Sequence, residues 1–135
     1  MPTFSKISMQ RLATCDARLQ ALFNEVVTHF DCVVLCGHRT KEEQDAAVAA
    51  GNSKTPFPKS KHNPSPSKAA DVAPFNRPDQ PVDWKDRERM TLFAGLVLGI
   101  AKVRGIHVRW GGDWDEDTDV KDNTFDDLVH FELVD

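Results

Sequence analysis

Residues 91–101, with the sequence TLFAGLVLGIA, form the longest apolar stretch of this 135-residue chain. The stretch is much shorter than the roughly 20 residues that span a bilayer, so it predicts a buried helix and no membrane insertion. We expect the helix to run from Asp83 to Arg104 and to end at Gly105, because glycine commonly follows the last turn of a helix. Its buried side then consists of Met90, Leu92, Phe93, Leu96, Val97, Ile100 and Val103.

The other segments alternate between helical and extended patterns. Leucine, phenylalanine and valine residues between positions 9 and 30 follow a helical spacing. Thr40 and Glu43 are spaced as a capping box, which predicts a second helix that stops at Gly51. Short apolar or β-branched segments predict strands at 32–39, 69–75, 106–114 and 129–134. This order predicts an α+β fold, in which helices pack on one face of a small, mostly antiparallel sheet.

Composition limits the classes of partner and compartment. The formal charge is −4 and the lysines and arginines form no large cluster, so we expect no nucleic-acid partner. The first residues, MPTFSKISMQ, lack an apolar run behind a basic start, so we expect no secretory signal. Three cysteines, an odd number, fit a reducing compartment. With 40% hydrophobic residues and no linker, the chain predicts a single domain over residues 1–135.

Three side chains at or beside the predicted strands are candidate metal ligands: His62, Asp71 and His130. Two imidazoles and one carboxylate suit Zn²⁺, and three protein ligands leave the fourth position of a tetrahedral site for water. Asp71 lies in a short apolar strand, where an unpaired carboxylate would be costly to bury. Taken singly, His62 is also explained as a surface histidine, and His130 as a hydrogen-bonded core histidine.

Three acids near His130 compete for the role of proton acceptor, which metal-activated water needs. In a regular strand Glu132 shares a face with His130, while Asp127 falls on the opposite face. Asp127 therefore reaches a metal at His130 only from a turn or a bulge, and Asp126 is its alternative. Glu132 is equally suited to orient a ligating histidine from behind.

Several other segments have simpler interpretations. Cys32 and Cys36 lie in an apolar run, where free cysteines behave as small hydrophobic residues, so we expect no cysteine metal site. Residues 52–68 predict a long loop, and such loops in compact domains are usually functional or disordered. The acidic residues 113–122 are most simply a solvated loop. The two remaining candidates, which serve only as alternative ligands, are His38 and His107.

Four segments resemble the motifs of a known family in order and spacing: GHRT at 37–40, SKHNPSPSKAADVAP at 60–74, WGGDW at 110–114 and HFEL at 130–133. They resemble the phage and prophage L-alanyl-D-glutamate peptidases, which belong to the zinc D-Ala-D-Ala carboxypeptidase superfamily. The resemblance covers nearly the whole chain. It implies that His62, Asp71 and His130 bind one Zn²⁺ per chain.

The resemblance also implies a reaction and roles for further residues. The substrate is the peptidoglycan stem peptide, cut between L-alanine and D-glutamate, with Asp127 as general base. Arg39 then binds substrate or stabilises its developing negative charge, although pairing with Glu42 or Glu43 is a structural alternative. Candidates for contacting the substrate or supporting the metal ligands are Ser60, Trp110, Trp114 and Glu132.

As a member of this family, the chain is expected to be a bacteriolytic endolysin. It would consist of one catalytic domain without a separate cell-wall-binding domain and act as a monomer. It would stay in the bacterial cytoplasm until its release to the cell wall. Two alternatives remain: a D-Ala-D-Ala carboxypeptidase or dipeptidase with the same zinc site, and a non-catalytic zinc-containing binding module. Asp127 argues against the second, because a binding module needs no base.

Overall fold

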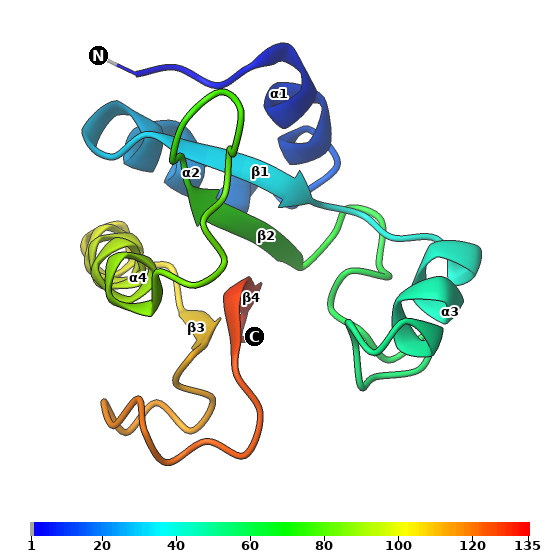
Figure 1. Ribbon diagram of the computed structural model, residues 1–135. Helices are drawn as coiled ribbons and strands as arrows, with labels where there is room; N and C mark the ends of the chain where they lie inside the picture. The colour runs from blue at the N-terminus through cyan, green and yellow to red at the C-terminus, as the bar shows by residue number, and fades with distance from the viewer. Residues whose placement is uncertain (1) are drawn as a thin grey trace.

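The computed structural model describes residues 2–135 and shows an α+β fold. Its four strands form one antiparallel sheet in the order β1-β2-β4-β3 (Figure 1). The predicted fold class is therefore confirmed. No helix among these residues is long and apolar enough to cross a membrane. The elements are α1 (Lys6–Leu12), α2 (Ala17–His29), β1 (Cys32–Cys36), α3 (Lys41–Ala49), β2 (Ala69–Pro74), α4 (Arg87–Val103), β3 (Val108–Gly111) and β4 (Asp127–Leu133).

Helices α2 and α4 pack on one face of the sheet and enclose the main core. Phe131 of β4 lies at its centre, with its ring 5.6 Å from that of Phe23 in α2 and 6.1 Å from that of Phe93 in α4, both edge to face. Aromatic pairs prefer this geometry, and each adds about 0.5–1.5 kcal/mol beyond the area it buries. The core therefore packs against one face of β4, which is one of the two inner strands of the sheet.

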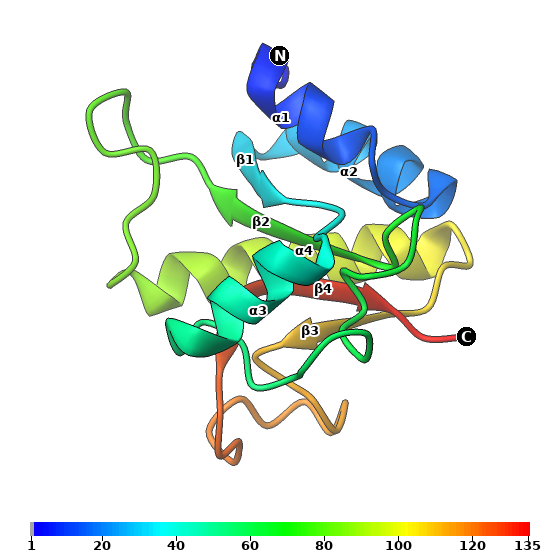
Figure 2. The same cartoon turned by 90° about the vertical axis from the view of Figure 1, so that its right-hand side faces the viewer.

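Helix α3 departs from the expected one-sided arrangement. It lies on the side of the sheet away from α4, together with the loop that follows it (Figures 1 and 2). Its start is the predicted capping box, in which Thr40 Oγ1 accepts from the backbone N–H of Glu43 and the Glu43 carboxylate accepts from that of Thr40. The far face of the sheet is thus partly covered, and this is the face on which the candidate site lies.

The helix predicted over residues 9–30 is two helices, and the break between them anchors the site. Asp16 caps α2 by accepting from the backbone N–H of Arg18. The backbone of Ser67, at the end of the long loop, donates to Thr14 O at 2.9 Å and accepts from Asp16 N at 2.8 Å. The break therefore fixes the end of the loop that carries His62.

Helix α4 is shorter than predicted and buries fewer side chains. Asp86 caps it by accepting from the backbone N–H of Arg89, so it begins four residues after Asp83. Leu92 and Val103, which were expected to be buried, are 67% and 89% exposed. The apolar residues of this helix extend around more than one face, and only one face meets the sheet.

Candidate metal centre and active site

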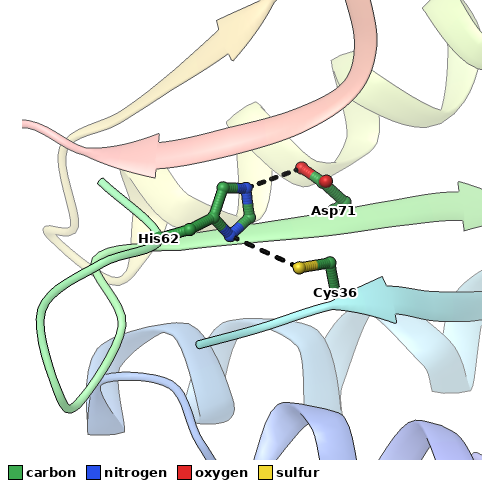
Figure 3. A group of neighbouring side chains, drawn as sticks. All are labelled: Cys36, His62 and Asp71. Carbon is green, nitrogen blue, oxygen red and sulfur yellow. Dashed lines mark hydrogen bonds and ion pairs between the residues drawn. The ribbon is translucent and has the colours of Figure 1, made fainter. Parts of the chain in front are cut away.

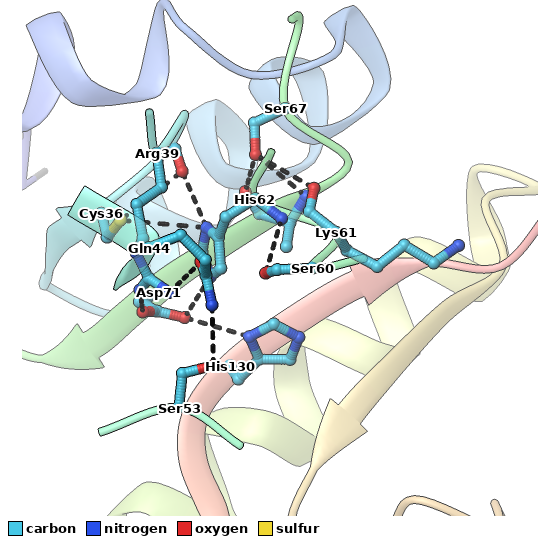
Figure 4. Close-up of polar contacts among 12 residues, drawn as sticks. Cys36, Arg39, Gln44, Ser53, Ser60, Lys61, His62, Ser67, Asp71 and His130 are labelled. Atoms are coloured by element: carbon cyan, nitrogen blue, oxygen red, sulfur yellow. Dashed lines mark hydrogen bonds and ion pairs between the residues drawn. The ribbon is translucent and has the colours of Figure 1, made fainter. Parts of the chain in front are cut away.

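Two of the predicted ligands lie directly opposite each other on neighbouring strands. Asp71 of β2 pairs with His130 of β4 in the antiparallel register, and His62 reaches them from the loop before β2. The Oδ1 atom of Asp71 is 3.1 Å from Nε2 of His62 and 3.2 Å from Nδ1 of His130 (Figure 4). All three side chains are largely buried. The structure therefore brings the three predicted residues together around one point.

The far nitrogen of each imidazole ring has its own acceptor. Nδ1 of His62 is 2.7 Å from the carbonyl oxygen of Gly37, and Nε2 of His130 is 2.8 Å from the carboxylate of Glu132. In each neutral ring the proton then lies on the far nitrogen, and the lone pair of the other nitrogen faces Asp71. Two lone pairs and one carboxylate oxygen converge, which is a donor set that fits a divalent cation such as Zn²⁺.

Without a cation, the same geometry favours protonated imidazole rings beside an ionised Asp71. Burial lowers the pKa of His62, but the hydrogen bond and the charge of Asp71 outweigh it and raise that pKa to about 10. In the same way the pKa of His130 is raised to about 9. Burial opposes ionisation of Asp71, yet the two histidines hold its pKa well below the usual range. A cation that binds here must therefore displace protons.

A register shift in the sheet carries Asp127 to the site. Trp110 of β3 pairs with Phe131 of β4, but the next residue, Gly111, pairs with Asp127, so β4 bulges between these positions. The bulge brings a carboxylate oxygen of Asp127 within 4.8 Å of ligand atoms of Asp71 and His130. Burial, followed by the charge of Asp71, raises the pKa of Asp127, which suits a proton acceptor.

The alternative acid, Asp126, is engaged elsewhere. Its Oδ2 atom accepts from Nη1 of Arg87 at 2.7 Å, and its Oδ1 atom accepts from Nδ2 of Asn123 at 3.1 Å. Asp126 does not line the pocket that contains His130 and Asp127. The geometry therefore favours Asp127 over its neighbour as the acid beside the candidate ligands.

The glycines of the WGGDW segment are needed for packing within the chain. A Cβ atom on Gly111 would collide with the backbone carbonyl of Asp127, and one on Gly112 would collide with the ring of Trp110. Trp110 lies in the core and donates from Nε1 to the backbone oxygen of Leu128 at 2.8 Å. Because Gly111 lacks a side chain, β3 can approach the start of β4, where Asp127 lies.

A pocket of about 270 Å³ opens beside the candidate ligands. Trp114 forms part of its wall, with the ring 5.5 Å from that of His130 and Nε1 bonded to Phe125 O. A larger hollow of about 550 Å³ lies between the end of α4 and β3, but His62, Asp71 and His130 do not line it. The smaller pocket is thus the candidate active site, and the predicted residues that line it are Arg39, Ser60, His62, Trp114, Asp127, His130 and Glu132.

Arg39 is held over the site by a residue that the sequence analysis missed. Its Nη2 atom is 3.5 Å from Asp71, and its Nη1 atom donates to Oε1 of Gln44 at 2.9 Å (Figure 4). Gln44 is fully buried and donates from Nε2 to Ser53 Oγ and Thr55 O. Among the described residues, no ion pair joins Arg39 to Glu42 or Glu43. The only signal in the sequence was an amide in the middle of a short helix.

Cys36 lies next to His62 but outside the pocket. Its Sγ atom is 3.8 Å from Nδ1 of His62, on the side of the ring opposite Asp71 (Figure 3). That nitrogen is already only 2.7 Å from the carbonyl oxygen of Gly37, and Cys36 does not line the pocket. The cysteine therefore packs behind the histidine and does not face substrate.

The remaining candidates lie away from the site. The His38 ring is bonded to Asn63 O, and the His107 ring lies 2.7 Å from Glu116. A group of three acids in the loop after β3 comprises Asp113, Asp115 and Asp117. Their carboxylates accept hydrogen bonds from the backbone of the same loop, which accounts for their arrangement.

The whole chain is similar to known peptidases in sequence and fold. The sequence profile of the family described as phage L-alanyl-D-glutamate peptidase matches residues 2–134. The L-alanyl-D-glutamate peptidase of Escherichia phage T5 is 31% identical over an alignment of 138 positions, which covers 97% of this chain and 97% of that protein. The crystal structure of the L-Ala D-Glu endopeptidase ChiX of Serratia marcescens matches with a TM-score of 0.76 and 26% identity, over 98% of this chain and 91% of that chain. The chain therefore belongs to the family of phage L-alanyl-D-glutamate peptidases.

Proposed function

We propose that this protein is a zinc-dependent peptidoglycan endopeptidase that hydrolyses the bond between L-alanine and D-glutamate in the stem peptide. The family supports the substrate and the bond. The observation that carries the proposal is the convergence of His62, Asp71 and His130 on one point, with Asp127 beside it in a pocket.

The residues divide into those that hold the metal and those that act on the substrate. Nε2 of His62, the carboxylate of Asp71 and Nδ1 of His130 would hold one zinc per chain. When bound, zinc polarises the scissile carbonyl and lowers the pKa of a water molecule towards about 7. Gly37 and Glu132 fix the tautomers of the two rings by accepting hydrogen bonds from the nitrogens that face away from Asp71.

Asp127 and Arg39 would carry out the steps that the protein itself contributes. The Asp127 carboxylate, with its raised pKa, accepts a proton from the attacking water and passes it to the leaving amine nitrogen. The Arg39 guanidinium stabilises the negative charge that develops on the carbonyl oxygen. Trp114 limits the access of water to one side of His130.

We also propose that the described residues form a single catalytic domain that acts as a monomer. One sheet and a shared core support the single domain. The relationship to a phage peptidase supports a role as an endolysin, held in the bacterial cytoplasm until it is released to the wall.

Mass spectrometry of peptidoglycan fragments after digestion tests the function. New N-terminal D-glutamate residues, which disappear when zinc is chelated, are the expected result. Loss of terminal D-alanine alone would instead assign a D-Ala-D-Ala carboxypeptidase. The absence of any released fragment, with zinc still bound, would assign a binding module.

A further inference from the structure

The candidate active site has a cationic rim formed by Lys54, Lys59 and Lys61, which all line the pocket. The protein as a whole carries a formal charge of −4, so this local excess of positive charge is not a reflection of its composition. The acids in the same lining are Asp127, which lies beside the candidate ligands, and Glu132, which is bound by His130 and Arg109. Neither acid neutralises the rim.

The three lysines form no ion pair with any carboxylate among residues 2–135, although other lysines of the chain do. Lys41 pairs with Asp45, and Lys68 pairs with Asp135. On the rim, the ammonium of Lys54 lies 4.6 Å from the ring centre of Phe125 across the pocket, and that of Lys61 donates one hydrogen bond to Leu133 O. These contacts hold the ammonium groups of Lys54 and Lys61 in place and leave donors free for an anion.

The loop that carries the rim is fixed to the protein body. The buried amide of Gln44 donates to Ser53 Oγ and Thr55 O on either side of Lys54. Ser60, between Lys59 and Lys61, donates from its backbone N–H to the side chain of Asn63, which in turn donates to the backbone oxygen of Arg39 outside the loop. A rigid platform reduces the entropy lost when the lysines bind a ligand.

The proposed substrate offers a matching anion. D-glutamate has two carboxyl groups, and when its amine is acylated by L-alanine and the peptide continues through one carboxyl group, the other remains ionised. That carboxylate is only a few bonds from the scissile nitrogen. We propose that Lys54, Lys59 and Lys61 bind this free carboxylate and make hydrolysis depend on its charge. The inference rests on the proposed function and adds the feature by which the pocket distinguishes D-glutamate from its neutral amide.

The test compares two stem peptides that differ only in this group, one with the free carboxylate and one with the carboxamide. The wild-type enzyme is expected to hydrolyse the first with a kcat/KM about tenfold higher, since exposed charge pairs each contribute a factor of roughly 1.5 to 5. The preference should shrink as salt rises, because exposed charges are screened. In Lys54→Gln/Lys59→Gln, which leaves Lys61 bonded to Leu133, kcat/KM should fall for the free carboxylate and stay constant for the carboxamide.

Lys85→Gln is the matched control, because it removes the same charge from an exposed lysine outside the pocket and should keep the full preference. Equal hydrolysis of both peptides by the wild type would overturn the role of the rim and leave the proposed function standing. A preference in the double variant as large as that of the wild type, or an equal loss on both peptides, would also overturn it. Failure of the wild type to cut either peptide or peptidoglycan would overturn the proposed function and this inference together.

Discussion

Glu132 accepts a hydrogen bond from Nε2 of His130 at 2.8 Å, which leaves Nδ1 of that ring facing Asp71. Arg109 holds the other carboxylate oxygen of Glu132 at 3.0 Å. The hydrogen bond to His130 and the charge of Arg109 keep the pKa of Glu132 below its usual range in spite of burial. An ionised acid behind a ligating imidazole fixes its orientation and makes it a stronger donor.

Replacing Glu132 should therefore lower the affinity for zinc while the protein remains folded. Glu132→Leu removes the acceptor, and zinc affinity should fall about 10–100-fold, as is typical when such a partner is lost. Glu132→Gln keeps an acceptor for Nε2 and should lose less. Competition with a chromophoric chelator measures both affinities, and circular dichroism checks the fold. An affinity of Glu132→Leu equal to that of the wild type would contradict this role.

Gln44 should matter for turnover although it does not line the pocket. Gln44→Leu leaves Nη1 of Arg39 without its Gln44 acceptor, and Nδ2 of Asn63 keeps only the backbone oxygen of Arg39. The loop at Ser53 and Thr55 loses the donor that Gln44 provides. Unpaired buried polar groups cost about 1–3 kcal/mol each, so the free energy of unfolding should fall. Because Arg39 is no longer held, kcat should also fall while zinc content is unchanged.

The exposed glutamine Gln10 in α1 provides the control for this variant. Gln10→Leu should change neither stability nor kcat appreciably. If Gln44→Leu lowers stability but leaves kcat at the wild-type value, Gln44 supports the fold alone and does not position Arg39.

Zinc binding should release protons at neutral pH. In the metal-free protein the pKa of His62 is about 10 and that of His130 about 9, so both rings are protonated at pH 7.5. Ligation needs both rings neutral, so close to two protons should leave per zinc, and affinity should rise with pH up to about 9–10. Calorimetry in buffers of different ionisation enthalpy measures this number. Release of no protons at pH 7.5 would contradict the arrangement.

The same shifts predict how the stability of the metal-free protein depends on pH. Both folded pKa values lie above the ordinary histidine value of about 6.5. The stabilisation that the two protonated rings provide is therefore fully present below about pH 6.5. It is lost as the pH rises through 9 and 10. Urea denaturation with a chelator present, at pH 6 and at pH 10, should show this loss, and His130→Asn should reduce it.

Features governed by local rules were predicted from the sequence. Thr40 and Glu43 form the expected capping box. The apolar segment AADVAP indicates locally that Asp71 needs partners. It has them in His62 and His130, which residue type and the family resemblance, and no local rule, identified. The four predicted strands are present, although each differs by one or more residues at its ends. Periodicity and capping depend on neighbouring residues, which is why the sequence reveals them.

Features that depend on distant residues were not predicted. The role of Gln44 depends on Arg39 and on a loop that folds back to it. Asp127 was expected to reach the site from a turn or a bulge, but the bulge itself depends on the close approach of Gly111 from β3, which no local pattern indicates. Leu92 satisfies the helical pattern but faces solvent, because no element formed by residues 2–135 covers that side of α4. In each case the decisive contact is tertiary.

The most direct test of the account compares two adjacent acids, Asp127 and Asp126. The turnover of peptidoglycan by Asp127→Asn and Asp126→Asn should be measured side by side, together with the zinc content of each variant. Asp127→Asn should keep one zinc per chain and lose about 10²–10⁴-fold in kcat, because it removes the proton acceptor. Asp126→Asn, which alters a partly exposed ion pair with Arg87 and a hydrogen bond from Asn123, should stay within a few-fold of the wild type. Full activity of Asp127→Asn, or a large loss of activity in Asp126→Asn alone, would contradict the account.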